Sequence, residues 1–151
     1  MSGFLLDTNV LSLLSPANLA GHAEFAAWLD RVDEAGRVLL SVVSVQEVEK
    51  AIDRLERGSA TAKAAALRHW LAGLLATFQD KILPIDVDVA IVAGRLESAA
   101  LAAGHDPGMA DALIGGTAKA HGLTVLTRNT RHFLPFAIDV VSPEYAISLP
   151  V

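Results

Sequence analysis

The sequence predicts an α/β fold, with a mostly parallel sheet of four to five strands flanked by helices. Short apolar runs alternate with longer stretches whose apolar residues recur every three or four positions, the pattern of strands alternating with helices. Polar residues follow several of the apolar runs directly. Because the sequence shows no repeat, low-complexity segment or linker, we expect residues 1–151 to form a single domain.

Composition narrows the class of protein. A chain of 151 residues can bury about 70% of its unfolded surface, so it needs no covalent staple. The absence of cysteine excludes disulfides and thiolate metal sites and suits a reducing compartment. No apolar run reaches the roughly 20 residues that cross a bilayer, and the start of the sequence lacks the basic region of a signal peptide. We therefore expect a soluble, cytoplasmic protein.

The net charge of −5 argues against a broad, non-specific binder of nucleic acid. It leaves open an enzyme that contacts nucleic acid at one local patch. The five histidines show no zinc-ligand spacing. The sequence also contains no phosphate-binding glycine loop and no serine in a nucleophile elbow.

Five segments are predicted to be strands. The first is apolar throughout and stops at Asp7. The second ends in β-branched residues, which favour strands. Pro84 in the third indicates a sheet edge or a strand end. The predicted strands are residues 4–6, 38–43, 82–85, 123–127 and 138–141.

Helices are predicted from apolar stripes and from the residues at their ends. Ser44 is expected to open a helix in a capping box, with Glu47 reaching back to the Ser44 amide. Asp86 is expected to cap a later helix, and Gly122 to stop the one after it. Apart from the helix that Asp86 caps, the predicted helices are residues 10–14, 22–34, 44–57, 59–78 and 109–121.

Three remaining segments are assigned by their residue types. Gly115-Gly116 lies inside the last predicted helix, where it is expected to permit close packing. The stretch from Arg128 to Phe133 is predicted to be a turn. The chain from Ser142 onward is predicted to be a tail.

Three acids and one amide meet at one edge of the sheet if the strands are parallel. Asp7 ends the first strand, while Glu47 and Asp111 each lie in the first turn of a predicted helix. Asn129 lies just beyond the fourth strand. Ligands bind at the carboxyl ends of parallel strands. Two carboxylates about 4 Å apart repel by roughly 4 kcal/mol at an effective dielectric of about 20, so the cluster calls for a cation or bound protons. Magnesium suits it, because it prefers oxygen ligands.

Each of these residues also has a purely structural alternative. Asp7 could cap a helix that starts at Thr8. Glu47 could serve only the capping box, and Asp111 could be an acid favoured by the helix dipole. Asn129 could be an ordinary turn residue. The functional interpretation rests on the set rather than on any one member.

Four segments carry recognisable motifs. They are Leu5-Leu6-Asp7-Thr8-Asn9-Val10-Leu11, Ser41-Val42-Val43-Ser44-Val45-Gln46-Glu47, Ala110-Asp111-Ala112-Leu113-Ile114-Gly115-Gly116-Thr117-Ala118 and His121-Gly122-Leu123-Thr124-Val125-Leu126-Thr127-Arg128-Asn129. Together they resemble PIN-domain ribonucleases, above all the VapC-type toxins of bacterial toxin–antitoxin pairs and their FitB-like branch. The resemblance covers nearly the whole chain in the family's order.

This resemblance implies a PIN fold and a divalent-metal endoribonuclease. Asp7, Glu47 and Asp111 match the family's three most regular acids, which implies that they bind Mg²⁺ or Mn²⁺ directly or through water. Glu47 would bind the metal or orient the attacking water. Asn129 matches a fourth position, often aspartate and sometimes asparagine, and supplies an oxygen without a charge. The missing charge favours one tightly bound metal over two.

The neighbours of these residues are assigned orienting or substrate-binding roles by the same resemblance. Thr8 and Asn9 match the segment beside the first acid, and Thr127 and Arg128 precede Asn129. Basic residues around the last motif could contact phosphates or could be ordinary solvated surface. These basic residues are Lys119, Arg128, Arg131 and His132.

Partners are implied in the same way. The family's toxins bind a small VapB-like antitoxin, act on RNA, and form homodimers that become heterotetramers or larger assemblies with the antitoxin. An antitoxin segment lies over hydrophobic helices and inserts a basic side chain among the acids. Several apolar residues are candidates for this surface, with burial in the core as the favoured alternative. They are Leu11, Leu13, Leu14, Trp70 and Leu74.

Two alternatives remain open at this stage. A strand ending in an acid also resembles phosphatases of the haloacid-dehalogenase type, but Asn9 stands where their second aspartate would be. The second alternative is a PIN-like module that has little or no catalytic activity and binds proteins. Three retained acids argue against it, because neutral residues would avoid the repulsion.

Overall fold

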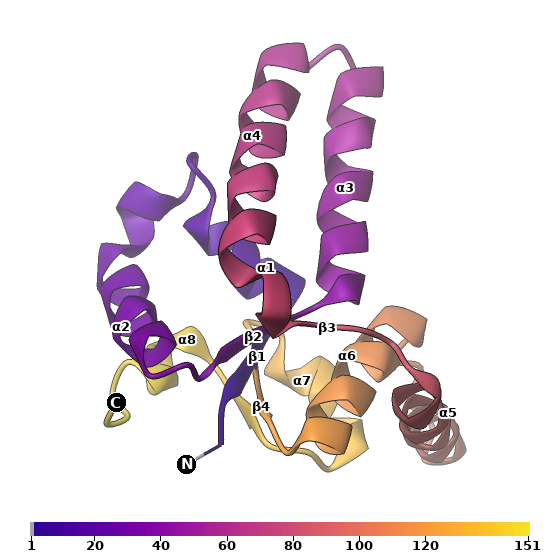
Figure 1. The fold of residues 1–151 in the computed structure, drawn as a ribbon. Helices are drawn as coiled ribbons and strands as arrows, with labels where there is room; N and C mark the ends of the chain where they lie inside the picture. Colours follow the sequence, from indigo (N-terminus) through magenta and orange to yellow (C-terminus); the bar gives the residue numbers. More distant parts are fainter. Residues whose placement is uncertain (1) are drawn as a thin grey trace.

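The computed structural model describes residues 2–151 and has a five-stranded, all-parallel sheet in the order β3-β2-β1-β4-β5 (Figure 1). This confirms the predicted α/β fold. The strands are β1 Phe4–Leu6, β2 Val38–Ser41, β3 Ile82–Leu83, β4 Thr124–Leu126 and β5 Val140–Val141. The helices are α1 Thr8–Leu11, α2 Ala23–Glu34, α3 Val42–Arg57, α4 Thr61–Phe78, α5 Val87–Ala102, α6 Met109–His121, α7 Thr130–Phe133 and α8 Pro143–Ala146. The described residues also form four short 3-10 helices, which are η1 Ser12–Leu14, η2 Leu19–His22, η3 Gln79–Lys81 and η4 Leu134–Phe136.

Side chains of the central strand β1 alternate between two cores. Leu6 packs with residues of α1, α2, α3 and α4 in one core, and Leu5 packs with residues of α5, α6 and α7 in the other. Both leucines are fully buried. Helices therefore cover both faces of the sheet, as a parallel sheet requires. Since β1 lies in the middle, the chain that leaves it at Asp7 emerges between the two helical layers.

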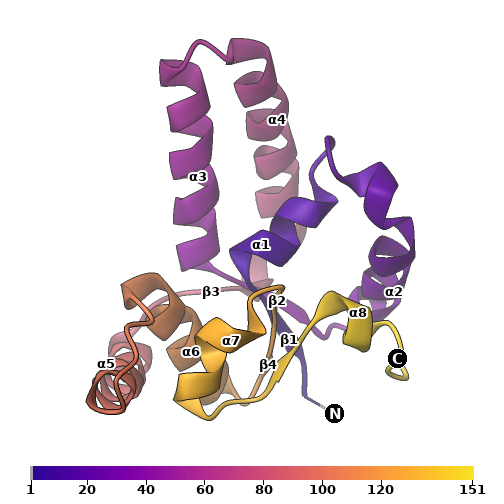
Figure 2. The same cartoon turned by 180° about the vertical axis from the view of Figure 1, so that it is seen from behind.

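The helices of the two layers are built differently. α3 and α4 form a long hairpin that projects from the sheet, while α5 and α6 pack closely side by side (Figures 1 and 2). Gly116 makes the second arrangement possible: a Cβ there would lie 2.7 Å from the Ala93 Cβ and 2.9 Å from the Ala93 backbone nitrogen. The prediction that Gly115-Gly116 permits close packing is confirmed.

Several predicted helix ends and strand positions are confirmed. The Asp86 carboxylate accepts a hydrogen bond from the Val89 amide at 2.9 Å and so caps α5. Gly122 follows α6 in the left-handed conformation that glycine tolerates, with a φ of 64°. β3 is an edge strand that pairs with β2, and it ends at Leu83, so Pro84 lies directly after it and the predicted strand over residues 82–85 is two residues too long.

The predicted capping box at Ser44 is wrong. β2 ends at Ser41, whose hydroxyl accepts a hydrogen bond from the Val43 amide at 3.0 Å and caps α3. Val42 and Val43, predicted to be strand because they are β-branched, therefore form the first turn of α3. Ser44 is a buried residue inside the helix, and Glu47 lies in the second turn rather than the first.

Two further segments differ from the prediction. The stretch predicted as a turn contains α7, whose Phe133 is fully buried. The predicted tail contains α8, and Ala146 in it is fully buried against the first core. Both helices have four residues, too few for a periodic pattern to reveal them. No helix within residues 2–151 combines the length and hydrophobicity needed to span a membrane.

Candidate functional site

Asp7 is the centre of a hydrogen-bond network at the carboxyl end of β1. It is only 6% exposed and caps α1, with Oδ1 accepting from the Thr8 amide at 2.8 Å. Its Oδ2 accepts from the Thr127 hydroxyl at 2.7 Å and from the Asn9 amide nitrogen at 3.2 Å. Asp7 therefore caps α1 through Oδ1, as the structural alternative predicts. Its other oxygen, Oδ2, contacts Thr127, which lies 120 residues later in the chain.

The segment after β4 is held against the segment after β1 by the same network. The Asn9 side-chain oxygen accepts from the Arg128 amide at 3.0 Å, and the Thr127 hydroxyl accepts from the Asn129 amide at 3.0 Å. Asn9 and Thr127 therefore orient Asp7 and the chain around it. Arg128 and Asn129 take part through their backbone amides, and both of their side chains are exposed.

Glu47 is tied to the same edge by Thr8. The Thr8 hydroxyl donates to Glu47 Oε1 at 2.6 Å and lies 3.1 Å from the buried Ser44 hydroxyl. The contact joins α1 to the second turn of α3 across 39 residues of sequence. Ser44 was missed as a site residue, because the capping-box pattern assigned it a different role. Its spacing of one helical turn before Glu47 was the available signal.

Asp111 lies in the first turn of α6, as predicted, and is paired with a residue of α7. The His132 Nδ1 atom lies 3.4 Å from Asp111 Oδ2. The sequence suggested His132 only as a phosphate contact. Its position three residues after Asn129 gave no sign that a short helix would turn the imidazole toward Asp111.

Burial and mutual repulsion raise the pKa of two of these acids. Burial is the main cause of the raised pKa of Asp7, and the Glu47 charge adds to it, against hydrogen bonds from Thr127 and Thr8. Burial, followed by the negative charge of Asp7, raises the pKa of Asp111 to about 6. The Asp111 carboxyl on α6 therefore lies close enough to Asp7, at the end of β1, for the negative charge of Asp7 to raise its pKa. Such shifted acids are typical of functional sites.

The donor set fits a hard divalent cation. Among residues 2–151, no three histidine, aspartate or glutamate side chains converge closely enough to hold a metal ion by themselves. Magnesium, however, is usually held by one or two carboxylates, with water filling its other positions. Asp7 and Asp111 offer two such carboxylates, with the His132 imidazole beside Asp111.

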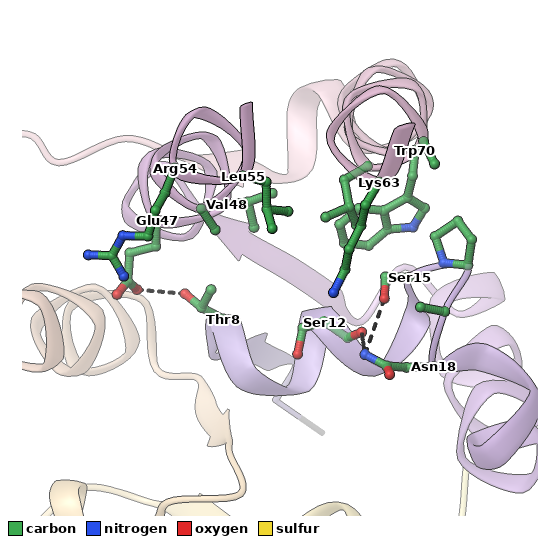
Figure 3. A pocket seen from close by; sticks show the side chains of 15 residues that line it. Thr8, Ser12, Ser15, Asn18, Glu47, Val48, Arg54, Leu55, Lys63 and Trp70 are labelled. Carbon is green, nitrogen blue, oxygen red and sulfur yellow. Dashed lines mark hydrogen bonds between the residues drawn. The ribbon is translucent and has the colours of Figure 1, made fainter. Parts of the chain in front are cut away.

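An apolar groove of about 440 Å³ opens on the Glu47 side of the acids (Figure 3). It runs between α1 and η1 on one side and α3 and α4 on the other, and Thr8 and Glu47 lie at one end of it. Two basic residues, Arg54 and Lys63, also line it. Its apolar walls are formed by Val48, Ala51, Leu55, Ala66, Leu67 and Trp70. Of the predicted surface residues, Trp70 lines this groove, whereas Leu11 and Leu13 are buried.

A smaller, more polar pocket of about 260 Å³ opens on the Asp111 side. It lies between the loop before α6 and the short helix α7. Its walls include two prolines, Pro107 and Pro135, but most of its lining is charged or polar. The polar residues are His105, Asp106, Asp111, Arg131 and His132. The acids thus lie between two hollows of different character.

The chain belongs to the PIN domain family, whose model matches residues 4–136. It is similar to Toxin FitB of Neisseria gonorrhoeae, at 35% identity over 140 residues that cover 92% of this chain and 96% of that protein. VapC ribonuclease Y4jK of Sinorhizobium fredii is 30% identical over the same coverage of both chains. The crystal structure of FitAcB from N. gonorrhoeae superposes with a TM-score of 0.79 and covers 94% of this chain and 99% of that one. The phosphatase alternative is therefore excluded by family membership.

Proposed function

We propose that this chain is the toxin of a type II toxin–antitoxin pair and a divalent-metal-dependent endoribonuclease that hydrolyses RNA phosphodiester bonds. The observation that carries the proposal is the gathering of three acids at the carboxyl end of a parallel sheet: Asp7 follows β1 and caps α1, Glu47 on α3 is held by Thr8, and Asp111 on α6 lies within the electrostatic influence of both. Relatives named as a toxin and as a VapC ribonuclease support it. RNA in the cytoplasm is then the substrate.

Asp7 and Asp111 would hold the metal, Mg²⁺ or Mn²⁺, with Glu47 contributing directly or through water. When bound, such an ion supplies Lewis acidity at the phosphate and lowers the pKa of water. Thr127, Asn9 and the Thr8 amide hold the Asp7 carboxylate in one orientation. Positioning of this kind contributes to catalysis because the reacting groups need no further ordering.

Glu47 orients the attacking water in this proposal. The Thr8 hydroxyl, 2.6 Å from one carboxylate oxygen, fixes the rotamer and leaves the second oxygen to accept a hydrogen bond from water. The water oxygen would bond to the phosphodiester phosphorus in line with the leaving oxygen as the bond to that oxygen breaks, with the proton of the water lost to solvent and the leaving oxygen protonated from solvent. The exposed Asn129 side chain would contact that water or the substrate without adding charge.

The apolar groove is the proposed site of a cognate VapB-like antitoxin. A segment that fills it would carry apolar side chains against Val48, Leu55 and Trp70. Because the groove ends at Thr8 and Glu47, the same segment would reach the acids and block them. We propose further that the toxin is a homodimer, and that it forms a heterotetramer or larger assembly with its antitoxin.

The test is cleavage of total RNA by purified, antitoxin-free protein. We expect discrete fragments with Mn²⁺ or Mg²⁺, none with EDTA, and none from the Asp7→Ala variant. Asp53→Ala is the matched control, because it removes an acid from the exposed surface of α3. Full activity of Asp7→Ala, or activity that survives EDTA, would overturn the proposal.

The second candidate is a protein-binding module with weak or no catalysis. The neutral residue at position 129 favours it, because the cluster lacks a fourth charge there. Calorimetric titration with Mn²⁺ separates the two functions. A nuclease should bind the ion at a site that Asp111→Asn weakens strongly, whereas a module without catalysis should show little binding in either protein.

A further inference from the structure

We propose that the polar pocket beside Asp111 binds a backbone phosphate of RNA next to the bond that is cut, with Arg131 as its principal ligand. This inference rests on the proposed ribonuclease function and specifies where its substrate lies. Neither the family match nor the names of the relatives assigns a role to this pocket.

The position of the pocket links it to the candidate site. Asp111 forms part of its wall, so a group inside it lies next to the acids. Its volume of about 260 Å³ is smaller than most pockets for whole drug-sized ligands and suits a phosphate with part of its ribose. Pro107 and Pro135 offer apolar surface for a sugar.

The charge of Arg131 supports an anionic occupant. Arg57, Arg68 and Lys81 pair with carboxylates, whereas Arg131 makes no ion pair with any residue from 2 to 151. An arginine fork that is not engaged by a carboxylate can bind phosphate through two hydrogen bonds. The imidazole of His105 can donate an N–H to the same anion, whereas His132 Nδ1 pairs with Asp111.

The contrast with the apolar groove favours RNA on this side of the acids. Apart from Arg54 and Lys63, the groove walls on α3 and α4 are mainly alanine, valine, leucine and tryptophan, which match apolar side chains of a protein partner better than a charged backbone. The pocket places Arg131 and two histidines beside the carboxylates of Asp106 and Asp111, so a phosphate bound there would rely on the guanidinium of Arg131. RNA steered to one local patch is compatible with the net charge of −5.

Binding measured against salt tests the inference without relying on turnover. Fluorescence anisotropy with a labelled 12-nucleotide single strand in EDTA gives Kd at several sodium chloride concentrations. Each phosphate contact to a single strand contributes about −0.7 to the slope of log affinity against log salt. We expect Arg131→Ala to reduce the slope by about 0.7 and to weaken binding roughly tenfold at 0.1 M salt.

Arg95→Ala on α5 is the matched control, because Arg95 is exposed, unpaired within residues 2–151 and lines neither hollow. It should leave the slope unchanged, and Arg131→Lys should restore most of it. Thermal unfolding shows that each variant is folded, with Arg131→Gln used if Arg131→Ala is not. In cleavage assays with Mn²⁺, Arg131→Ala should raise KM about tenfold and change kcat less than twofold.

The outcomes separate this inference from the proposed function. If the wild type cleaves RNA but Arg131→Ala binds with the same slope as Arg95→Ala, the pocket assignment is wrong and the ribonuclease stands. If the wild type neither binds nor cleaves RNA, the proposed function fails and this assignment fails with it. If the wild type cleaves RNA and the salt slope is lowered by Arg131→Ala but not by Arg95→Ala, both the proposed function and the pocket assignment are supported.

Discussion

The two hollows beside Asp7 and Asp111 are built by different parts of the fold. The groove lies between α1 and η1 on one side and the projecting α3–α4 hairpin on the other. Most of its wall residues on the hairpin are apolar. The pocket is formed by the start of α6 and by α7, in the layer where Gly116 brings α6 against α5. An apolar surface suits a protein partner, and a polar surface suits a charged substrate. The difference suggests that inhibition and substrate binding approach the same acids from opposite sides.

The largest expected effect is that of Asp111→Asn on cleavage. Loss of a carboxylate that binds the metal should cost several kcal/mol of transition-state stabilisation, or roughly a thousandfold in rate. Steady-state cleavage assays with Mn²⁺ measure this. Asp80→Asn, an exposed acid of η3, should retain full activity. A loss below tenfold for Asp111→Asn would mean that the pocket side does not contribute to the metal site.

The same variant should stabilise the metal-free protein at high pH. Because folding raises the pKa of Asp111 to about 6, the folded chain binds a proton that the unfolded chain has released. This contribution is fully present below about pH 4 and is lost as pH rises through about 6. We expect Asp111→Asn to gain about 1 kcal/mol, or a few degrees in Tm, at pH 8 and about half of that at pH 5. Scanning calorimetry in EDTA at both pH values checks the sign.

Paired glycine substitutions compare the packing of the two layers. Gly116→Ala would force apart α5 and α6, at a net cost of about 1–2 kcal/mol after the better helix propensity of alanine is counted. Gly73→Ala in α4 meets no atom within 4 Å and should gain about 0.5–1 kcal/mol. Urea unfolding of both variants measures the difference. If the two variants changed stability in the same direction, α5 and α6 would not be as tightly constrained as their contact indicates.

Removing the Thr8 hydroxyl should have a moderate effect on activity. Thr8→Val keeps the shape but releases Glu47, and we expect kcat to fall about tenfold, equivalent to about 1.4 kcal/mol. Thr8→Ser preserves the hydroxyl and should stay within about threefold of the wild type. If valine and serine variants are equally active, the contact with Glu47 has no role in orienting the carboxylate.

The smallest effect expected on substrate binding is that of Ala51→Glu in the groove. The substitution places a negative charge on an exposed position of α3 in the groove. If RNA lay in the groove, this charge would repel it strongly and raise KM. We expect KM for RNA to rise less than twofold, well below the tenfold rise expected for Arg131→Ala. A larger rise for Ala51→Glu than for Arg131→Ala would reverse the assignment of the two hollows.

Features encoded in a few adjacent residues could be predicted from the sequence. The apolar run that ends at Asp7, the Asp86 cap and the Gly122 stop all depend on local conformation, and all are confirmed. The prediction that the second strand includes Val42 and Val43 is wrong, because two local signals compete at these residues. The Ser41 hydroxyl capped the helix, and this outweighed the β-propensity of the two valines.

Features that depend on tertiary contact could not be predicted. The link from Thr8 to Ser44 and the pairing of His132 with Asp111 join segments that are far apart in sequence. The burial of Ala146 depends on a core that the rest of the chain builds. The catalytic and metal-binding roles of Asp7, Glu47, Asp111 and Asn129, as well as those of their neighbours, remain predictions for the experiments above.

The bond between Asp7 and Thr127 has a consequence for the synthesis of the protein. The two residues are 120 positions apart, an interval that takes a ribosome roughly 6 to 24 seconds to translate. Until β4 has emerged, β1 lacks one of its two partner strands and the Asp7 carboxylate has no Thr127 to hold it. A nascent chain therefore carries the first acid long before it carries the complete cluster of acids. A cell translating the message would meet the folded PIN domain only when nearly all of it has been made.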